Sequence, residues 1–136
     1  MKKLTLTVIA ALISCITFAQ IEIRGRVTQI NRCELLDSGG FRILKTTYPP
    51  IQTSIRLNDN ELVIVNDNRI RFELSDKMVD SSNNQLTINY MSSFRKKLLM
   101  IAVMECGEGM KIGIFSMEGD TKFTEYIVPK VRVAKQ

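Results

Sequence analysis

Two residue types are missing from the sequence: its 136 residues include no histidine and no tryptophan. The absence of histidine excludes serine-histidine-aspartate and cysteine-histidine mechanisms, histidine-based zinc sites and histidine-ligated haem. Walker, GxGxxG and GxSxG motifs are absent as well. Chemistry by paired carboxylates stays open, although Glu22, Glu73 and Glu125 are expected on solvated strand faces. We therefore expect a protein that is not an enzyme and that uses no cofactor.

The N-terminus has the pattern of a secretory signal peptide. Two lysines precede an apolar run from Leu4 to about Ile13, and small residues flank Phe18. The apolar run is shorter than the roughly 20 residues that a membrane-spanning helix needs. We predict a signal peptide over residues 1–19, a mature chain that starts at Gln20, and an exported protein, periplasmic or extracellular.

A second interpretation of the same segment is a lipoprotein. The stretch LISC, which ends at Cys15, resembles the lipobox of bacterial lipoproteins. A lipid anchor is normally followed by a polar flexible spacer, whereas Ile16 and Phe18 lead directly into the strand-like residues Ile21 and Ile23. Contact with a membrane is expected only in this alternative, with Cys15 lipidated.

Residues 20–136 are expected to form a single β domain. Removing 19 residues leaves 136 − 19 = 117, which is enough for one small domain. Without the two lysines of the signal peptide, the net charge becomes (19 − 2) − 14 = +3. This modest excess is typical of a soluble surface, and we expect no nucleic acid partner.

The mature chain keeps two cysteines, Cys33 and Cys106, and export would place both in an oxidising compartment. Their spacing fits neither a CxxC redox motif nor a zinc site. We predict a disulfide between them, with two separate thiols as the alternative, because sequence alone does not show the distance between their Cα atoms.

Alternation of apolar and polar residues runs through most of the mature chain and is typical of half-buried strands. The continuous apolar run Leu98–Met104 is ambiguous between helix and strand, and we interpret it as a central strand. The polar residues 75–84 are expected to form a connecting loop. The pattern predicts an all-β fold: a small antiparallel up-and-down barrel or sandwich of about eight short strands, preceded by a signal peptide.

The tripeptide NDN occurs twice, around Asp59 and Asp67. Asparagine and aspartate stabilise turns through side-chain hydrogen bonds to their own backbone, and short alternating runs flank both copies. A calcium loop needs several oxygen ligands around a glycine, whereas each copy supplies one carboxylate and no glycine. We predict two hairpin turns and no metal site.

The sequence favours a non-catalytic binding protein or a structural component of the cell envelope. The alternative is a lipocalin-like carrier of a small apolar ligand, a likeness of fold only. A carrier keeps a cavity beneath its inward apolar residues, whereas an interaction module fills its interior and exposes an apolar patch or an edge strand. The basic run from Phe94 to Lys97 is a candidate contact for anionic ligands, with a solvated turn as the alternative. The partner, a protein or a small molecule, and the oligomeric state are not specified by the sequence.

Overall fold

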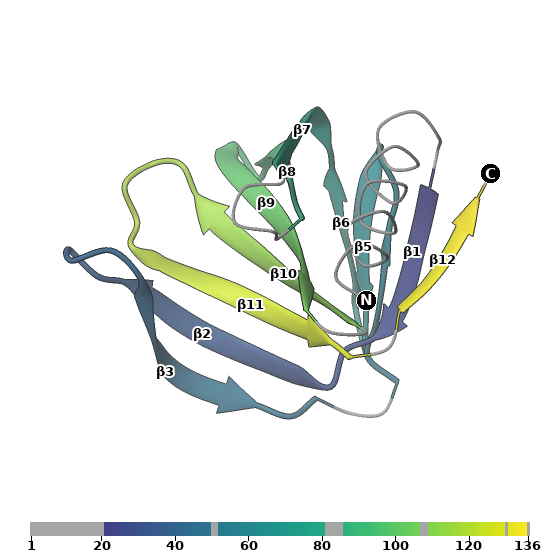
Figure 1. Cartoon of the computed structure of the whole chain (residues 1–136), viewed down its shortest axis with the longest axis horizontal. Helices are drawn as coiled ribbons and strands as arrows, with labels where there is room; N and C mark the ends of the chain where they lie inside the picture. Colours follow the sequence, from purple (N-terminus) through teal and green to yellow (C-terminus); the bar gives the residue numbers. More distant parts are fainter. Residues whose placement is uncertain (1–20, 50–51, 81–85, 107–108, 130, 136) are drawn as a thin grey trace, which may run out of the picture.

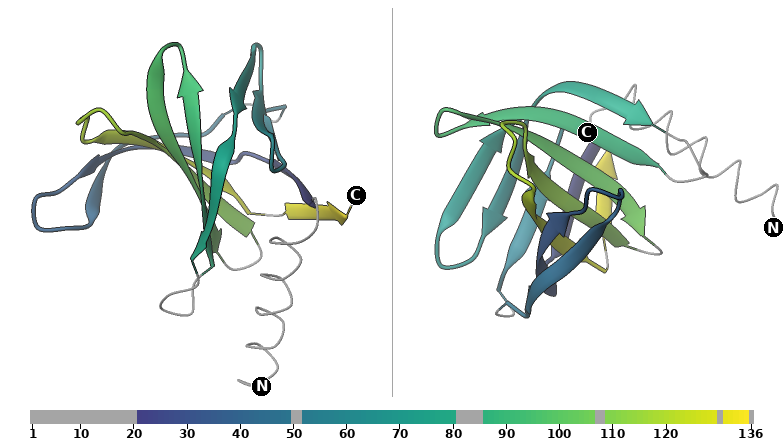
Figure 2. Two further views of the ribbon diagram at one scale, coloured as in Figure 1. Left: turned by 90° about the horizontal axis from the view of Figure 1, so that it is seen from above. Right: turned by 90° about the vertical axis from the view of Figure 1, so that its left-hand side faces the viewer.

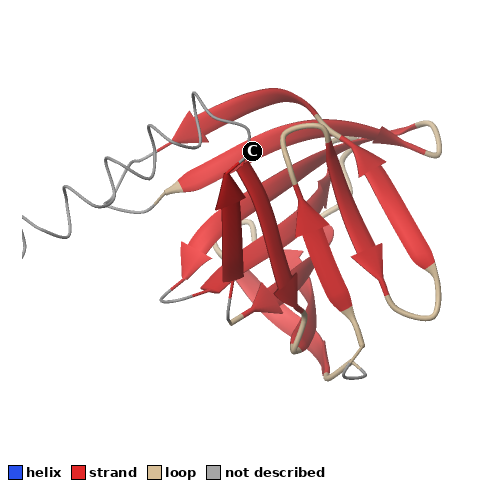
Figure 3. Ribbon diagram, turned by 90° about the vertical axis from the view of Figure 1, so that its right-hand side faces the viewer, coloured by secondary structure: helices blue, strands red, loops and turns tan. Residues whose placement is uncertain are grey.

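The computed structural model describes residues 21–49, 52–80, 86–106, 109–129 and 131–135. These residues form twelve strands in two antiparallel sheets (Figures 1 and 3). Within these ranges the structure holds no apolar helix of the length that crossing a membrane requires. The predicted signal peptide and Cys15 lie outside the described residues.

Sheet A has five strands in the spatial order β12-β1-β4-β5-β6. Its members are β1 Ile21–Arg26, β4 Ser54–Leu57, β5 Glu61–Val65, β6 Arg69–Glu73 and β12 Val131–Lys135. Sheet B has seven strands in the order β3-β2-β11-β10-β9-β8-β7. Its members are β2 Gln29–Leu35, β3 Phe41–Thr47, β7 Ser75–Asp80, β8 Thr87–Phe94, β9 Lys97–Cys106, β10 Gly109–Ser116 and β11 Lys122–Val128.

The chain passes from one sheet to the other at tight corners. Between β1 and β2, the amide of Val27 donates to the carbonyl of Thr53 at 2.9 Å, and the amide of Thr28 donates to that of Ile127 at 3.1 Å. Between β6 and β7 the corner is Leu74, whose amide donates to the carbonyl of Asn60 at 2.9 Å. The first corner thus bonds the chain to both sheets and the second bonds it to the β4–β5 turn of sheet A, because a buried amide needs a partner.

A single hydrophobic core lies between the facing sides of the two sheets. Alternate residues of the central strands point to it, as the period of a strand requires, whereas all residues of the edge strand β3 are exposed. The fully buried side chains with the largest volumes include Tyr90, Leu57, Leu62, Ile88, Ile101 and Ile112. Burial of such side chains contributes about 1.5–3 kcal/mol each, so this shared core holds the sheets together.

The all-β prediction is confirmed, and the closed barrel is wrong. The sheets are separate and not joined into a ring: β12 and β6 are the edges of one, and β3 and β7 are the edges of the other. The number of strands also exceeds the predicted eight. The alternating run after Ile21 divides into two strands at the Val27 corner, and the expected loop at 75–80 is the edge strand β7, whose polar residues suit an exposed edge. Residues 81–85 lie outside the described part.

The interpretation of Leu98–Met104 as a strand is confirmed. This segment lies within β9, which pairs with β8 on one side and β10 on the other. Ile101 and Val103 point into the core, while Ala102 is buried on the opposite face. A strand with apolar residues on both faces produces the continuous run seen in the sequence.

Both NDN segments form the predicted hairpin turns. The Oδ1 of Asn58 accepts hydrogen bonds from the amides of Asn60 and Glu61, and the Oδ1 of Asn66 accepts one from the amide of Asn68. These are the side-chain turns that the sequence indicated.

The predicted disulfide is not formed. Cys33 is buried in β2, Cys106 is exposed at the end of β9, and both are free thiols. Because β11 and β10 lie between these strands, the two cysteines are separated across the sheet by three strand spacings, roughly 14 Å at about 4.8 Å each. They are further apart along the strands, because the register places Cys33 level with Met100 rather than with Cys106. A disulfide joins Cα atoms that are less than about 7 Å apart.

Candidate functional site

The candidate site lies where sheet B extends past sheet A. Figures 1 and 2 show the β2–β3 and β10–β11 turns at the end of the molecule that lies away from β1 and β12. We call this region the open end of sheet B; it comprises the hairpin of β2 and β3 and the adjoining ends of β9, β10 and β11. On the side of sheet B that faces the core, the strands continue beyond the core and line a hollow.

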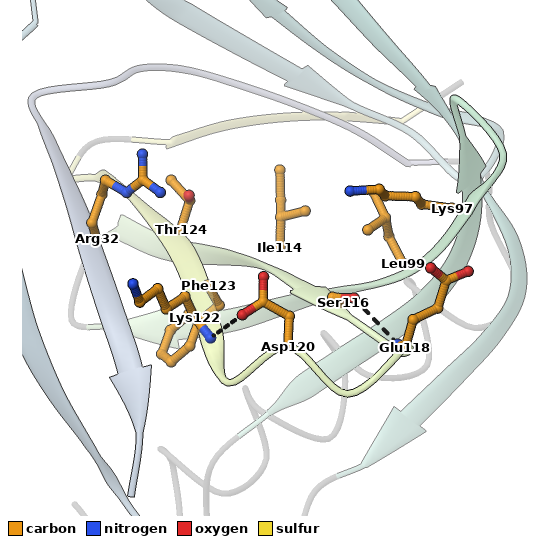
Figure 4. A pocket seen from close by; sticks show the side chains of 10 residues that line it. All are labelled: Arg32, Lys97, Leu99, Ile114, Ser116, Glu118, Asp120, Lys122, Phe123 and Thr124. Carbon is orange, nitrogen blue, oxygen red and sulfur yellow. Dashed lines mark hydrogen bonds between the residues drawn. The ribbon is translucent and has the colours of Figure 1, made fainter.

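This hollow, the groove, has a volume of about 380 Å³ and is open to solvent (Figure 4). Its lining residues are aliphatic, aromatic, hydroxyl-bearing and charged, and they come from four strands and one turn. The lining residues are Arg32, Lys97, Leu99, Ile114, Ser116, Glu118, Asp120, Lys122, Phe123 and Thr124.

Strand register explains how the groove continues from the core. On β10, Ile112 is buried in the core, Ile114 is half-buried beside it, and Ser116 follows on the same face. Ile114 pairs with Thr124 of β11, and Ser116 pairs with Leu99 of β9. The core face thus changes from apolar to polar within two positions, which leaves Ile114 and Leu99 as a partly exposed aliphatic floor.

Three cations surround this floor. Arg32, Lys97 and Lys122 are exposed, and none makes an ion pair or a side-chain hydrogen bond within the described residues. In Figure 4, Arg32 and Lys97 come from opposite sides of the floor, with Ile114 and Thr124 between them. Charged groups without protein partners at the rim of a hollow are available to a ligand of opposite charge.

The two carboxylates of the groove have structural roles in their own turn. Asp120 accepts a hydrogen bond from the amide of Lys122 at 3.0 Å. Glu118 accepts a longer one, at 3.5 Å, from the amide of Leu98, and its own amide donates to Ser116. Between them, Gly119 has φ +92°, which residues other than glycine rarely adopt. The two carboxylates thus stabilise the turn, whereas the three cations have no side-chain partner in the part of the chain that the structure describes.

Local turn geometry places Lys97 at the groove. Arg95 and Lys96 have φ values of 50° and 66°, as the central residues of a type I′ hairpin turn do. The guanidinium of Arg95 lies 5.0 Å from the centroid of the Phe94 ring, which is a favourable cation–π distance. Of the predicted basic run, only Lys97 lines the groove.

The opposite face of the open end is apolar, and we call it the aromatic face: Leu35, Phe41, Ile43, Phe115 and Phe123. The rings of Phe115 and Phe123 are stacked with centroids 4.3 Å apart, and Phe41 meets Phe123 edge-on at 5.4 Å. Phe41 and Ile43 remain 45% and 52% exposed. A contiguous exposed patch of this kind is typical of an interaction surface.

Buried polar groups lie next to the aromatic face. The amide nitrogen of Asn31 donates to Glu125 at 3.2 Å, and its oxygen accepts hydrogen bonds from Gln29 at 3.0 Å and Thr46 at 2.9 Å. Glu125 is therefore buried rather than solvated as expected, and so is Glu22 on β1. Burial raises the pKa of the Cys33 thiol, and the nearby Glu125 carboxylate raises this pKa further. A neutral buried thiol of this type is unreactive.

The structure brings the sequence-derived candidate residues to different places. Asp59 accepts a hydrogen bond from the hydroxyl of Tyr90 at 2.9 Å and pairs with the ammonium of Lys77 at 2.9 Å. Asp59 and Asp67 lie in turns at opposite ends of β5. Within the described ranges there is no group of three or more metal-ligating side chains.

Sequence reasoning missed Arg32, Lys122 and the groove itself. The available signal was the replacement of apolar by polar residues near the ends of alternating strands, at Ser116 and Thr124. Comparison with models of known protein families finds no match, and comparison with curated proteins finds none either.

Proposed function

We propose that the protein is an exported, non-catalytic binding protein whose groove takes an anionic ligand with an apolar part. One observation carries this proposal: Arg32 and Lys97 lie on opposite sides of the aliphatic floor, without partners in the described part of the chain. An anionic group would interact with the cations, and a hydrocarbon segment would cover Leu99 and Ile114. Both the ionic and the apolar interaction are needed for binding, because an exposed ion pair alone contributes only about 0–1 kcal/mol.

The groove favours this ligand class over the purely apolar ligand of a lipocalin-like carrier. Between the sheets, large side chains such as Tyr90, Leu62 and Ile101 fill the interior, so a ligand would bind in the open groove. Export follows from the predicted signal peptide, and anchoring through Cys15 is the alternative form of the same protein.

Titration with three small probes tests the groove. Octanoate carries both a charge and a chain, 1-octanol carries only the chain, and acetate carries only the charge. We expect octanoate to bind at least tenfold more tightly than either of the others, with the largest amide chemical-shift changes at Leu99 and Ile114. Octanol binding as tight as octanoate binding would favour the apolar carrier instead.

Matched variants test the role of charge. Arg32→Gln and Lys97→Gln should each weaken octanoate binding about fivefold, because loss of one exposed charge contact is worth about 1 kcal/mol. The control Arg69→Gln removes an exposed charge from β6, away from the groove, and should leave binding unchanged. Equal effects of all three variants would contradict the proposed site.

A further inference from the structure

We propose that the free edge of β3 binds a partner through an extended segment in which apolar and acidic residues alternate. The partner segment would pair antiparallel with β3 as an additional strand of sheet B. This interaction is separate from the groove and goes beyond the function proposed above.

The first observation is the exposure of β3. All seven of its residues are exposed, and among the described strands it pairs only with β2. One side of its backbone is therefore open for the hydrogen bonds of an added strand, which is the basis of β-augmentation. Figure 1 shows β3 at the outer border of sheet B.

The second observation is the division of chemistry between the two faces of β3. Phe41 and Ile43 belong to the aromatic face. On the groove face, Lys45 lies opposite Arg32 in the strand register, and Arg42 lies opposite Glu34. A segment added to this edge would therefore meet apolar side chains on one face and basic ones on the other.

A β-bulge produces this division. The register shifts between Arg32 and Cys33, so that Leu44 has no partner on β2. In a regular strand, residues three apart lie on opposite faces. The extra residue, Leu44, returns Lys45 to the face that carries Arg42.

The charges select the partner. In a strand pair, opposite charges across the strands are stabilising and like charges are destabilising. The ammonium of Lys45 and the guanidinium of Arg32 make no ion pair within the described residues, whereas Arg42 is paired with Glu34 at 2.8 Å. A second copy of β3 would bring more arginine and lysine to this edge, so an acidic strand fits better than a copy of the chain.

The other described edges differ from β3. On β6, Arg71 is paired with Glu61 and Glu73. Arg69 makes no ion pair within the described residues, but the apolar Ile70 and Phe72 face the core. β7 pairs irregularly with β8, and Asp76 within it has φ 53°. Such irregularity and paired charge protect an edge from strand addition. Among the edges whose side chains are described, β3 combines exposed apolar residues with an unpaired cation.

The test uses three nine-residue peptides with blocked ends. In the first, valine and glutamate alternate; in the second, lysine replaces glutamate; the third has the composition of the first with its valines and glutamates in separate blocks. We expect the alternating acidic peptide to bind at least tenfold more tightly than the others in low salt. Hydrogen exchange at β3 amides should slow on binding. Equal binding of all three peptides, or no binding of the first, would overturn the proposal.

Charge reversal provides the matched control. Lys45→Glu should weaken the acidic peptide at least tenfold and improve binding of the lysine peptide, whereas Arg69→Glu on edge strand β6 should change neither. Ile43→Ser should weaken both alternating peptides. Lys97→Gln should affect octanoate but not the peptide, so the two proposals can fail separately. A dimer of the free protein that Ile43→Ser abolishes would instead identify a second copy as the occupant and overturn the acidic partner.

Discussion

The outer face of sheet A and the open end of sheet B both carry arginines and carboxylates on exposed strands, but they differ in how those charges are paired. On sheet A the charges form a continuous ladder across four strands. Its members are Glu22, Arg24, Arg56, Glu61, Arg71 and Glu73. At the open end, Arg32, Lys97 and Lys122 lack such partners within the described residues.

The difference separates two uses of similar surface strands. The charges of the ladder pair with one another around the buried Val63. Arg26 and Arg69, at the borders of the same face, make no ion pair within the described residues. Unpaired cations beside an aliphatic floor and an apolar face leave interactions to be made by another molecule. We therefore assign folding and solubility to the outer face of sheet A, and binding to the open end.

The largest effect is expected from isoleucine-to-alanine substitutions made in the core and at the open end. Ile101→Ala removes a fully buried side chain from β9 and should lower the free energy of unfolding by about 2–5 kcal/mol. Ile43→Ala removes the same atoms from a half-exposed site on β3 and should change it by less than about 0.5 kcal/mol. Denaturant unfolding measures the free energy of unfolding of both variants. Similar losses of stability would show that the open end is part of the folding core.

Local sequence patterns were sufficient to predict much of the fold. Alternation identified the paired strands of the core, and the asparagines of the two NDN copies indicated turns that the structure contains. These features depend on residues near one another in sequence.

Features that depend on sheet order could not be predicted in this way. The predicted disulfide was wrong because β10 and β11 lie between the strands that carry Cys33 and Cys106. The groove needs β2 beside β11, and no local pattern places these strands together because they are far apart in the sequence. The predicted closed barrel was wrong because tight corners such as Val27 divide one continuous alternating run between two sheets.

A smaller effect is expected from a pair of tyrosines. Tyr90→Phe removes the hydroxyl that donates to Asp59, which lies in the turn before β5. We expect a loss of about 1–2 kcal/mol in the free energy of unfolding, because a buried hydroxyl donates to a partly exposed charged group. Tyr48→Phe is the control, since Tyr48 is 75% exposed beyond β3. An equal effect of both substitutions would argue against the anchoring role of Asp59.

The smallest expected effect concerns the ladder and depends on pH. The hydrogen bond from Arg71 lowers the pKa of Glu61, burial opposes this shift, and Arg56 lowers the pKa further. A lowered folded-state pKa stabilises the fold above the ordinary value of 4.5, and this contribution is lost as the pH falls through the folded-state pKa. Glu61→Gln should therefore lower the melting temperature at pH 7 but have little effect at a pH below both values.

Glu118→Gln is the matched substitution at the open end, where the carboxylate accepts one long hydrogen bond from the amide of Leu98. Because Glu118 has no ion pair within the described residues, its replacement should change the melting temperature at pH 7 less than that of Glu61. Thermal unfolding of both variants from pH 3 to pH 7 measures the difference. If the melting temperatures of the two variants change with pH in the same way, the ladder contributes no more to folding than the unpaired charges do. The distinction between the paired ladder and the open end would then fail.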